Sequence, residues 1–202
     1  MSDTGLRERK KLRTREAIID AALRLFEENG FEHTTIADIA EAADIAPRTF
    51  FGYFPSKEDV VFADFPELVD GLEARLDERP PQETTLDALR VWIGELVENP
   101  VAPDDRDRCR KRLIAESEPL AAHQRALMGR IDQLLAKHIA RDLGDEADDL
   151  RPRMLAASVI GALGAIDVKG SEAPPPPDEA LAMVDEALNF LRGGMEALRR
   201  SG

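Results

Sequence analysis

The chain has 202 residues, of which 43% are hydrophobic and 33% charged, with a formal net charge of −13 and one cysteine. It contains no apolar run of the ~18 residues that a membrane span requires and no signal-like N-terminus, and a single cysteine excludes an internal disulfide. These features exclude a membrane-spanning or disulfide-stabilised protein and predict a cytoplasmic location.

The first predicted helix runs from Thr14 to Asn29. Its apolar residues recur at the spacing of one buried helix face, and the pair Asn29-Gly30 is a stop signal. A basic arm precedes this helix, because six Lys or Arg against one Glu give residues 7–15 a charge of +5. Such an arm suits contact with DNA phosphates or a minor groove, and it also suits a solvated, disordered tail. Its basic residues are Arg7, Arg9, Lys10, Lys11, Arg13 and Arg15.

The residues that follow predict two short helices joined by a tight turn, which is a helix-turn-helix. The first has apolar residues at positions three, four and seven after Ile36, and Thr34 or Thr35 caps its start. The second begins at about Pro47, where a first-turn proline is tolerated, and it ends just before Pro55.

In a helix-turn-helix, the second helix lies in the major groove with its N-terminal residues on base edges. Arg48 is the first candidate for base recognition, because arginine donates two hydrogen bonds to guanine. Tyr53 and Lys57 are better suited to hold the phosphate backbone. The alternative is an ordinary pair of helices in which Arg48 is a solvated charge. The predicted DNA-contacting residues are Thr34, Thr35, Pro47, Arg48, Thr49, Tyr53 and Lys57.

The segments 14–31, 34–40 and 48–59 together resemble the DNA-binding domain of the TetR family of transcriptional repressors. The resemblance implies an all-helical homodimer with an N-terminal DNA-binding domain and a larger C-terminal domain that binds a small molecule and then releases DNA. Three residues depart from the family's usual pattern. Ala46 stands where a capping serine is common, Phe50 replaces the usual leucine, and Phe51 lacks the hydroxyl of the usual tyrosine.

The rest of the chain predicts six further helices, since proline and glycine interrupt it at intervals and no stretch alternates as strands do. The expected fold is all-α, with a three-helix helix-turn-helix domain at residues 1–57 and a six-helix ligand-binding and dimerisation domain at 58–202. The acidity belongs to the second domain, because residues 1–57 carry a charge of −1 and the remainder −12. The expected helices after the first three span 56–79, 84–98, 104–117, 119–142, 147–168 and 178–200.

The last two predicted helices each carry an apolar stripe. In the TetR family, the equivalent helices pair with their twofold mates as a four-helix bundle, so the resemblance implies that these stripes form the dimer interface. A purely intramolecular core is the alternative. The residues are Leu155, Val159 and Ala162 in the first stripe and Leu188, Leu191 and Met195 in the second.

The middle helices supply apolar candidates for an effector site, although core packing explains them equally well. These are Phe62, Phe65, Trp92, Leu96, Leu113, Met128 and Ile131. The predicted helix at 56–79 begins at the DNA-binding domain and carries two of them, so we expect it to transmit effector binding. The basic cluster from Arg106 to Arg112 either meets an anionic ligand such as an acyl-coenzyme A or pairs with the acidic domain's own carboxylates.

The sequence predicts no cofactor, metal site or enzymatic activity. His33, His123 and His138 do not have metal-ligand spacing, and Cys109 has no cysteine partner. Neither a Gly-rich phosphate loop nor a nucleophile elbow is present. We therefore expect a repressor that binds a palindromic double-stranded DNA operator as a homodimer and leaves it when a small apolar or amphipathic effector binds, without a membrane partner. The alternative is a helical protein-interaction adaptor with weak DNA binding.

Overall fold

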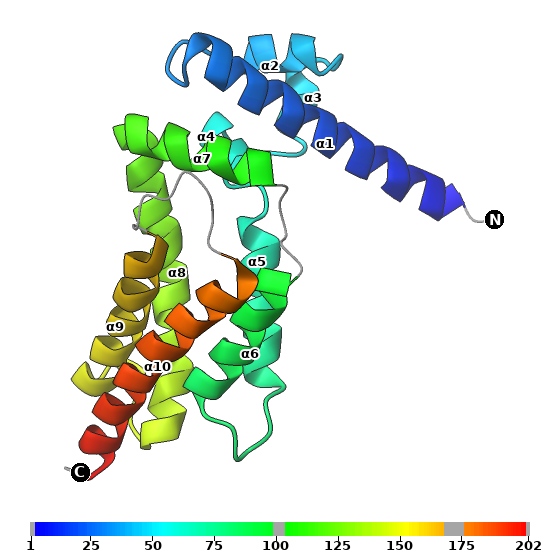
Figure 1. The fold of residues 1–202 in the computed structure, drawn as a ribbon. Coiled ribbons are helices and arrows are strands. Elements are labelled where there is room, and N and C mark those ends of the chain that lie inside the picture. The colour runs from blue at the N-terminus through cyan, green and yellow to red at the C-terminus, as the bar shows by residue number, and fades with distance from the viewer. Residues whose placement is uncertain (1–2, 99–103, 168–175, 201–202) are drawn as a thin grey trace. The chain divides into compact units, whose positions relative to one another are not determined.

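The computed structural model describes residues 3–98, 104–167 and 176–200. Within these ranges the chain forms ten helices and no strand (Figure 1), which confirms the all-α prediction. None of the described helices is both long and apolar enough to cross a membrane. Two compact units are present, Met1–Phe65 with Ala102–Arg125 and Pro66–Val101 with Ala126–Gly202. This grouping differs from the predicted division after residue 57.

The first unit is organised around its longest helix, α1, which contacts α2, α4 and α7, while α3 packs on α2. Its interior is made of aromatic and branched aliphatic side chains. Phe50 and Phe54 are both buried, with ring centroids 6.0 Å apart. The helices of this unit are α1 (Asp3–Asn29), α2 (Ile36–Ala42), α3 (Pro47–Phe50), α4 (Lys57–Val61), α7 (Asp104–Glu116) and the first turns of α8 (Glu118–Leu143).

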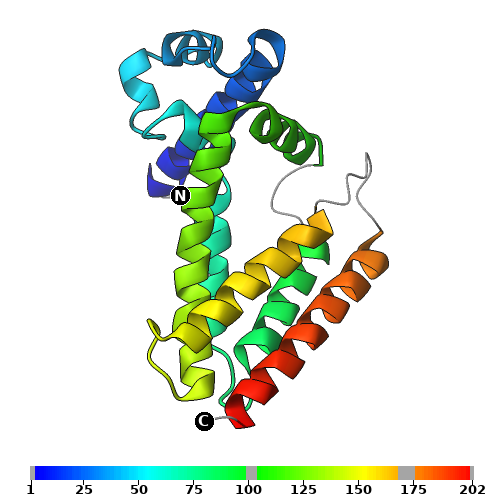
Figure 2. The same ribbon diagram turned by 90° about the vertical axis from the view of Figure 1, so that its left-hand side faces the viewer.

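The second unit is a helical bundle in which α10 contacts both α6 and α9 (Figure 2). Within this unit, Arg79 and Asp142 form a buried ion pair, with the guanidinium 2.7 Å from Asp142 Oδ1. The Thr85 amide donates to Asp142 Oδ2, also at 2.7 Å. This carboxylate therefore fixes the start of α6 against the end of α8. The helices are α5 (Phe65–Asp77), α6 (Thr85–Glu98), the remainder of α8, α9 (Leu150–Asp167) and α10 (Pro177–Arg200).

Two predicted boundaries were wrong. Helix α1 begins at Asp3 instead of Thr14, because extending an established helix avoids the cost of nucleation and Lys, Arg and Leu are good helix formers. The single helix expected at 56–79 is two helices, interrupted at residues 62–64. Pro66 explains the break, since a proline lacks the amide donor of a helix interior and is tolerated in the first turn of a new helix.

Candidate nucleic-acid interface

The first helix of the predicted helix-turn-helix is held at its start by reciprocal hydrogen bonds. The Asp38 amide donates to the Thr35 hydroxyl at 3.2 Å, and the Thr35 amide donates to the Asp38 carboxylate at 2.8 Å. This capping box satisfies two amides that a helix start leaves without partners. The Thr35 hydroxyl also donates to the Asp38 carboxylate at 2.7 Å, and this bond, followed by that of the Thr35 amide, lowers the pKa of Asp38. Thr35 is exposed, but its hydroxyl is engaged in the cap.

The turn between α2 and α3 has a defined geometry. Asp44 adopts a left-handed backbone conformation with a φ of 53°. Its amide donates to the Glu41 carbonyl at 3.1 Å, and the Ile45 amide donates to the Ala40 carbonyl at 2.9 Å. This is the Schellman pattern of a helix C-terminus, and aspartate is one of the residues that tolerate the left-handed region. The turn therefore fixes the direction in which α3 leaves α2.

Helix α3 presents an exposed face formed by Pro47, Arg48 and Thr49. Phe50, on the other face, is fully buried and anchors the helix. The amide of Phe54 still donates to the Phe50 carbonyl at 3.0 Å, so the helical turn continues past the formal end of α3 toward the half-buried Tyr53. Ala46 provides no side-chain cap. Four of the predicted contact residues thus reach one outward surface.

Thr34 and Lys57 lie differently from the prediction. Thr34 is only 1% exposed, and its hydroxyl donates to the Gly30 carbonyl at 2.9 Å. The Lys57 ammonium donates to the carbonyls of Phe31 at 2.7 Å and Thr34 at 3.1 Å. It also lies 4.3 Å from the centroid of the Phe31 ring, a cation–π distance. These contacts engage the ammonium with carbonyls of its own chain. Sequence spacing carries no signal of carbonyls that a loop brings together.

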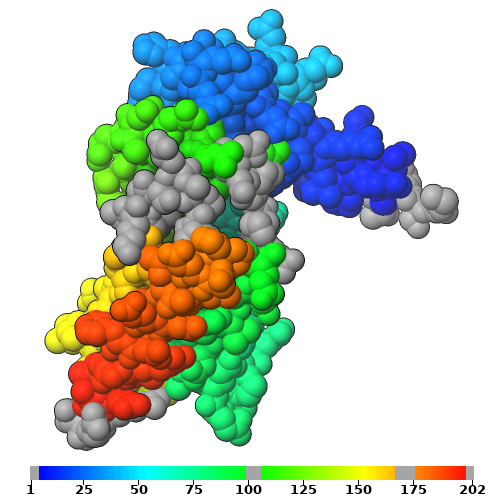
Figure 3. Space-filling model, in the orientation of Figure 1, coloured from blue at the N-terminus to red at the C-terminus, as the bar shows by residue number. Residues whose placement is uncertain are grey.

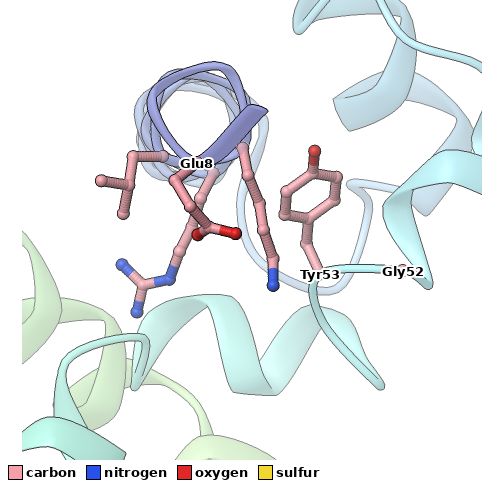
Figure 4. A pocket seen from close by; sticks show the side chains of 6 residues that line it. Glu8, Gly52 and Tyr53 are labelled. Atoms are coloured by element: carbon pink, nitrogen blue, oxygen red, sulfur yellow. The ribbon is translucent and has the colours of Figure 1, made fainter. Parts of the chain in front are cut away.

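Sequence reasoning missed a groove that joins the start of α1 to the recognition segment. One part is lined by residues of α1 together with Thr49, Tyr53 and the turn residues Asp44 and Ile45. An adjoining part is lined by α1 with Gly52 and Tyr53, and Figure 4 shows Glu8 and Tyr53 on its opposite sides. The α1 residues of the first part are Arg7, Lys10, Lys11 and Thr14. The signal that could have found it is the helical spacing of these four residues.

The basic cluster of α7 pairs with carboxylates of the first unit. Arg106 lies 2.8 Å from Glu16 and 2.6 Å from Asp20, both on α1. Arg110 donates to the Val61 carbonyl at 2.6 Å and to Asp64 at 2.8 Å. The pairing hypothesis therefore needs a correction, since carboxylates of α1 serve as partners in addition to a carboxylate of the predicted acidic domain.

Cys109 lies within this docked helix. Burial, together with the neighbouring Glu27, raises the pKa of its thiol to about 11. The thiol is therefore neutral at physiological pH and is a packing group.

The predicted effector residues fall in both units. Phe62, Phe65 and Leu113 are buried in the first, where the Phe62 ring stacks on the His123 imidazole with centroids 5.2 Å apart. The remaining four, Trp92, Leu96, Met128 and Ile131, are half-buried in the second. Among the described residues, no group of three or more His, Cys, Asp and Glu is arranged to hold a metal ion.

Most of the predicted dimer residues pack inside their own chain. Leu155, Val159, Leu188, Leu191 and Met195 are buried, and Ala162 is half-buried. The intramolecular alternative therefore accounts for these stripes. The outer faces of the same two helices carry other apolar residues, notably Met154, which is 51% exposed, and Phe190, which is 81% exposed.

Comparisons with known proteins agree with this architecture. The family described as bacterial regulatory proteins, tetR family, matches residues 18–63, and the MftR C-terminal domain matches residues 83–196. The transcriptional regulator TcmR of Streptomyces glaucescens is 36% identical over 172 residues, which cover 80% of this chain and 74% of that protein. The regulator MftR of Mycobacterium tuberculosis is 31% identical over 160 residues, covering 79% and 81%.

Solved structures share the fold. The complex of SmeT with triclosan has a TM-score of 0.58 at 25% identity, covering 88% of this chain and 90% of that one. Thermus thermophilus FadR, a TetR-family repressor in complex with lauroyl-CoA, has a TM-score of 0.58 at 25% identity, covering 90% and 94%. The family matches span the helix-turn-helix and most of the following helices, and so the chain belongs to the TetR family of transcriptional regulators.

Proposed function

We propose that the protein is a repressor that binds a near-palindromic operator as a homodimer and leaves it when a small apolar or amphipathic effector binds. The exposed face of α3 carries this proposal. Pro47, Arg48 and Thr49 lie outward on a helix whose opposite side is anchored by the buried Phe50. A capped α2 and a hydrogen-bonded turn hold that helix, which is the rigid support that base recognition needs.

The outer faces of α9 and α10 support the homodimer. Gly161, Gly193 and Gly194 lie within these helices, where each glycine costs helix stability, yet a methyl group in place of the hydrogen would meet no neighbouring segment within 4 Å. Packing within the chain therefore does not require them. Small residues at these positions would allow a second pair of helices to approach closely, and Phe190 and Met154 would supply apolar contact area beside them. Helix α10, orange to red in Figure 3, lies at the surface of its unit.

The half-buried apolar side chains of the second unit support the nature of the effector. Trp92 and Leu96 on α6, and Met128 and Ile131 on α8, keep part of their surface uncovered. An apolar ligand would gain from covering that surface. Triclosan and lauroyl-CoA, named in the SmeT and FadR structures, are apolar or amphipathic molecules of this broad kind.

Selection of binding sites from a random duplex library tests the proposal. We expect the purified protein to enrich an inverted repeat whose half-sites lie about one helical turn, ~34–36 Å, apart. Arg48→Ala should weaken binding to that duplex by ~1–3 kcal/mol and relax base choice at one position in each half-site. Arg24→Ala, which removes an exposed arginine from α1, is the matched control. Failure to enrich any sequence, or equal effects of the two substitutions, would contradict base recognition by α3.

A further inference from the structure

The first turns of α1 concentrate positive charge on a regular helix. Arg7, Arg9, Lys10, Lys11 and Arg13 are all exposed. Arg15 is set apart from them, because its guanidinium donates to the Ala63 carbonyl and lies 5.7 Å from the Phe54 ring centroid. At about 100° per residue, the exposed cations divide between two faces of the helix. Arg7, Lys10 and Lys11 share one face, and Arg9 and Arg13 lie on the opposite one.

The two faces have different surroundings. Arg7, Lys10 and Lys11 line the groove that Thr49 and Tyr53 border on the other side. Arg9 and Arg13 line neither part of that groove. The Arg9 guanidinium instead donates to the Gly5 carbonyl of its own helix at 3.0 Å. Asp44 and Glu8 also border the groove and would repel an anion, which opposes the attraction of the three cations.

The helical state of this segment decides what it can contact. An α-helix with its side chains is about 10–12 Å across, whereas the minor groove of DNA is about 6 Å wide. The helical start of α1 therefore cannot enter the DNA minor groove, as a disordered arm could. Lysine is a compact point charge suited to a single phosphate. The groove places those charges beside Thr49 and Tyr53 of the proposed recognition segment.

We propose that the face formed by Arg7, Lys10 and Lys11 binds phosphates of the DNA strand that borders the major groove occupied by α3. This inference rests on the proposed function. The contact adds affinity and fixes the orientation of α3, but it carries no sequence information.

A charge-matched pair of double variants tests the proposal. Lys10→Gln/Lys11→Gln and Arg9→Gln/Arg13→Gln each remove two exposed cations from the same helix. Binding is measured by fluorescence anisotropy over a range of KCl concentrations. The targets are a mixed-sequence duplex and an A·T-rich duplex, each of 30 base pairs, and the selected operator. The lysine variant should lower the slope of log affinity against log salt by ~3.6 on each duplex, because a bound dimer loses four phosphate contacts and each removes about 0.9. The arginine variant should lower it much less.

The possible outcomes separate the phosphate contact from the proposed function. Equal losses in the two variants would show a diffuse charge effect and overturn the groove assignment, as would an unchanged slope in the lysine variant. A loss confined to A·T-rich duplexes would indicate minor-groove contact and also overturn it. If the wild-type protein selected no operator, the proposed function itself would fail. An operator bound normally by the lysine variant would leave that function intact and refute only this inference. Far-ultraviolet circular dichroism confirms that both variants stay helical.

Discussion

At the scale of single residues, the ammonium of Lys57 stabilises the loop before α2 within the first unit. Its ammonium binds the carbonyls of Phe31 and Thr34, which belong to the loop that leads into α2. Lys57→Met keeps the aliphatic stem and removes the charge, so two carbonyls lose their donor. We expect the free energy of unfolding to fall by ~1–3 kcal/mol, as for hydrogen bonds to charged groups. Chemical denaturation measures this directly.

The control for Lys57 is Lys137→Met, which removes an exposed lysine whose ammonium lies 3.6 Å from the Glu73 carboxylate. Its loss should cost under ~1 kcal/mol. DNA binding separates the two roles considered for Lys57. A structural lysine leaves the salt dependence of the folded protein unchanged, whereas a phosphate contact would flatten it. A flattened slope with unchanged stability would contradict the structural role.

His138 is the second informative residue, since it is 0% exposed. Arg141 lies 3.5 Å from its Nδ1 atom, and because a guanidinium only donates, Nδ1 is assigned as the acceptor and the proton is placed on Nε2. The Nε2 atom lies 3.6 Å from Asp77 Oδ1. Burial, and then Arg141, lowers the pKa of His138 below its ordinary value. The folded protein therefore holds this histidine neutral.

This shift predicts a pH dependence of stability. The unfolded chain binds a proton at His138 below about pH 6.5, while the folded chain does not until lower pH, so unfolding takes up a proton in that window. Stability should be complete above about pH 6.5 and fall as the pH drops, by at most ~1.4 kcal/mol per pH unit for one proton. His138→Gln should remove this component, and His33→Gln, at an exposed position, should not. Identical pH profiles for both variants would refute the assignment.

At the scale of elements, α7 docks on α1 and α4 through arginines of unequal burial. Arg110 binds the last residue of α4 through the Val61 carbonyl and also pairs with Asp64, and its side chain is 16% exposed. Arg112 pairs with Glu27 on α1 but remains 59% exposed. Arg110→Met should lower the free energy of unfolding by ~1.5–3 kcal/mol, and Arg112→Met by under ~1 kcal/mol. Thermal and denaturant unfolding compare the two, and equal costs would show that the Arg110 contacts do not hold α7 in place.

Local patterns were enough to predict most elements, whereas contacts between distant segments could not be predicted from them. The apolar spacing after Ile36 and the prolines at 47 and 55 were enough to predict α2, the turn and α3. Pro66 could have predicted the break between α4 and α5, because its effect is local. The inward position of Lys57 could not be predicted, since its partners lie more than 20 residues away. The placement of α7 against α1 was also out of reach, because ion pairs between distant segments leave no periodic signal.

At the scale of the whole molecule, the proposed homodimer and the proposed operator impose the same symmetry. A twofold protein presents the same contact residues twice, so an inverted repeat in DNA requires two copies of α3 related by that axis. A monomer would engage one half-site and lose the contribution of the other. A substitution that disrupts the proposed dimer contact on the outer faces of α9 and α10 should therefore weaken operator binding without altering α3.

Phe190 is the residue that tests this link. It is 81% exposed on α10, beside glycines that the chain's own packing does not require. Phe190→Asp would place a carboxylate in an apolar interface, and the lost aromatic burial counts once per protomer, ~3–6 kcal/mol in total. Sedimentation velocity should show a monomer at micromolar concentrations, and operator affinity should fall while circular dichroism stays unchanged. Val91→Asp, at a 43% exposed apolar position on α6, should leave the dimer intact. A dimeric Phe190→Asp variant would place the twofold interface on another surface, because a charged group buried without a partner in a helix interface is too costly to be silent.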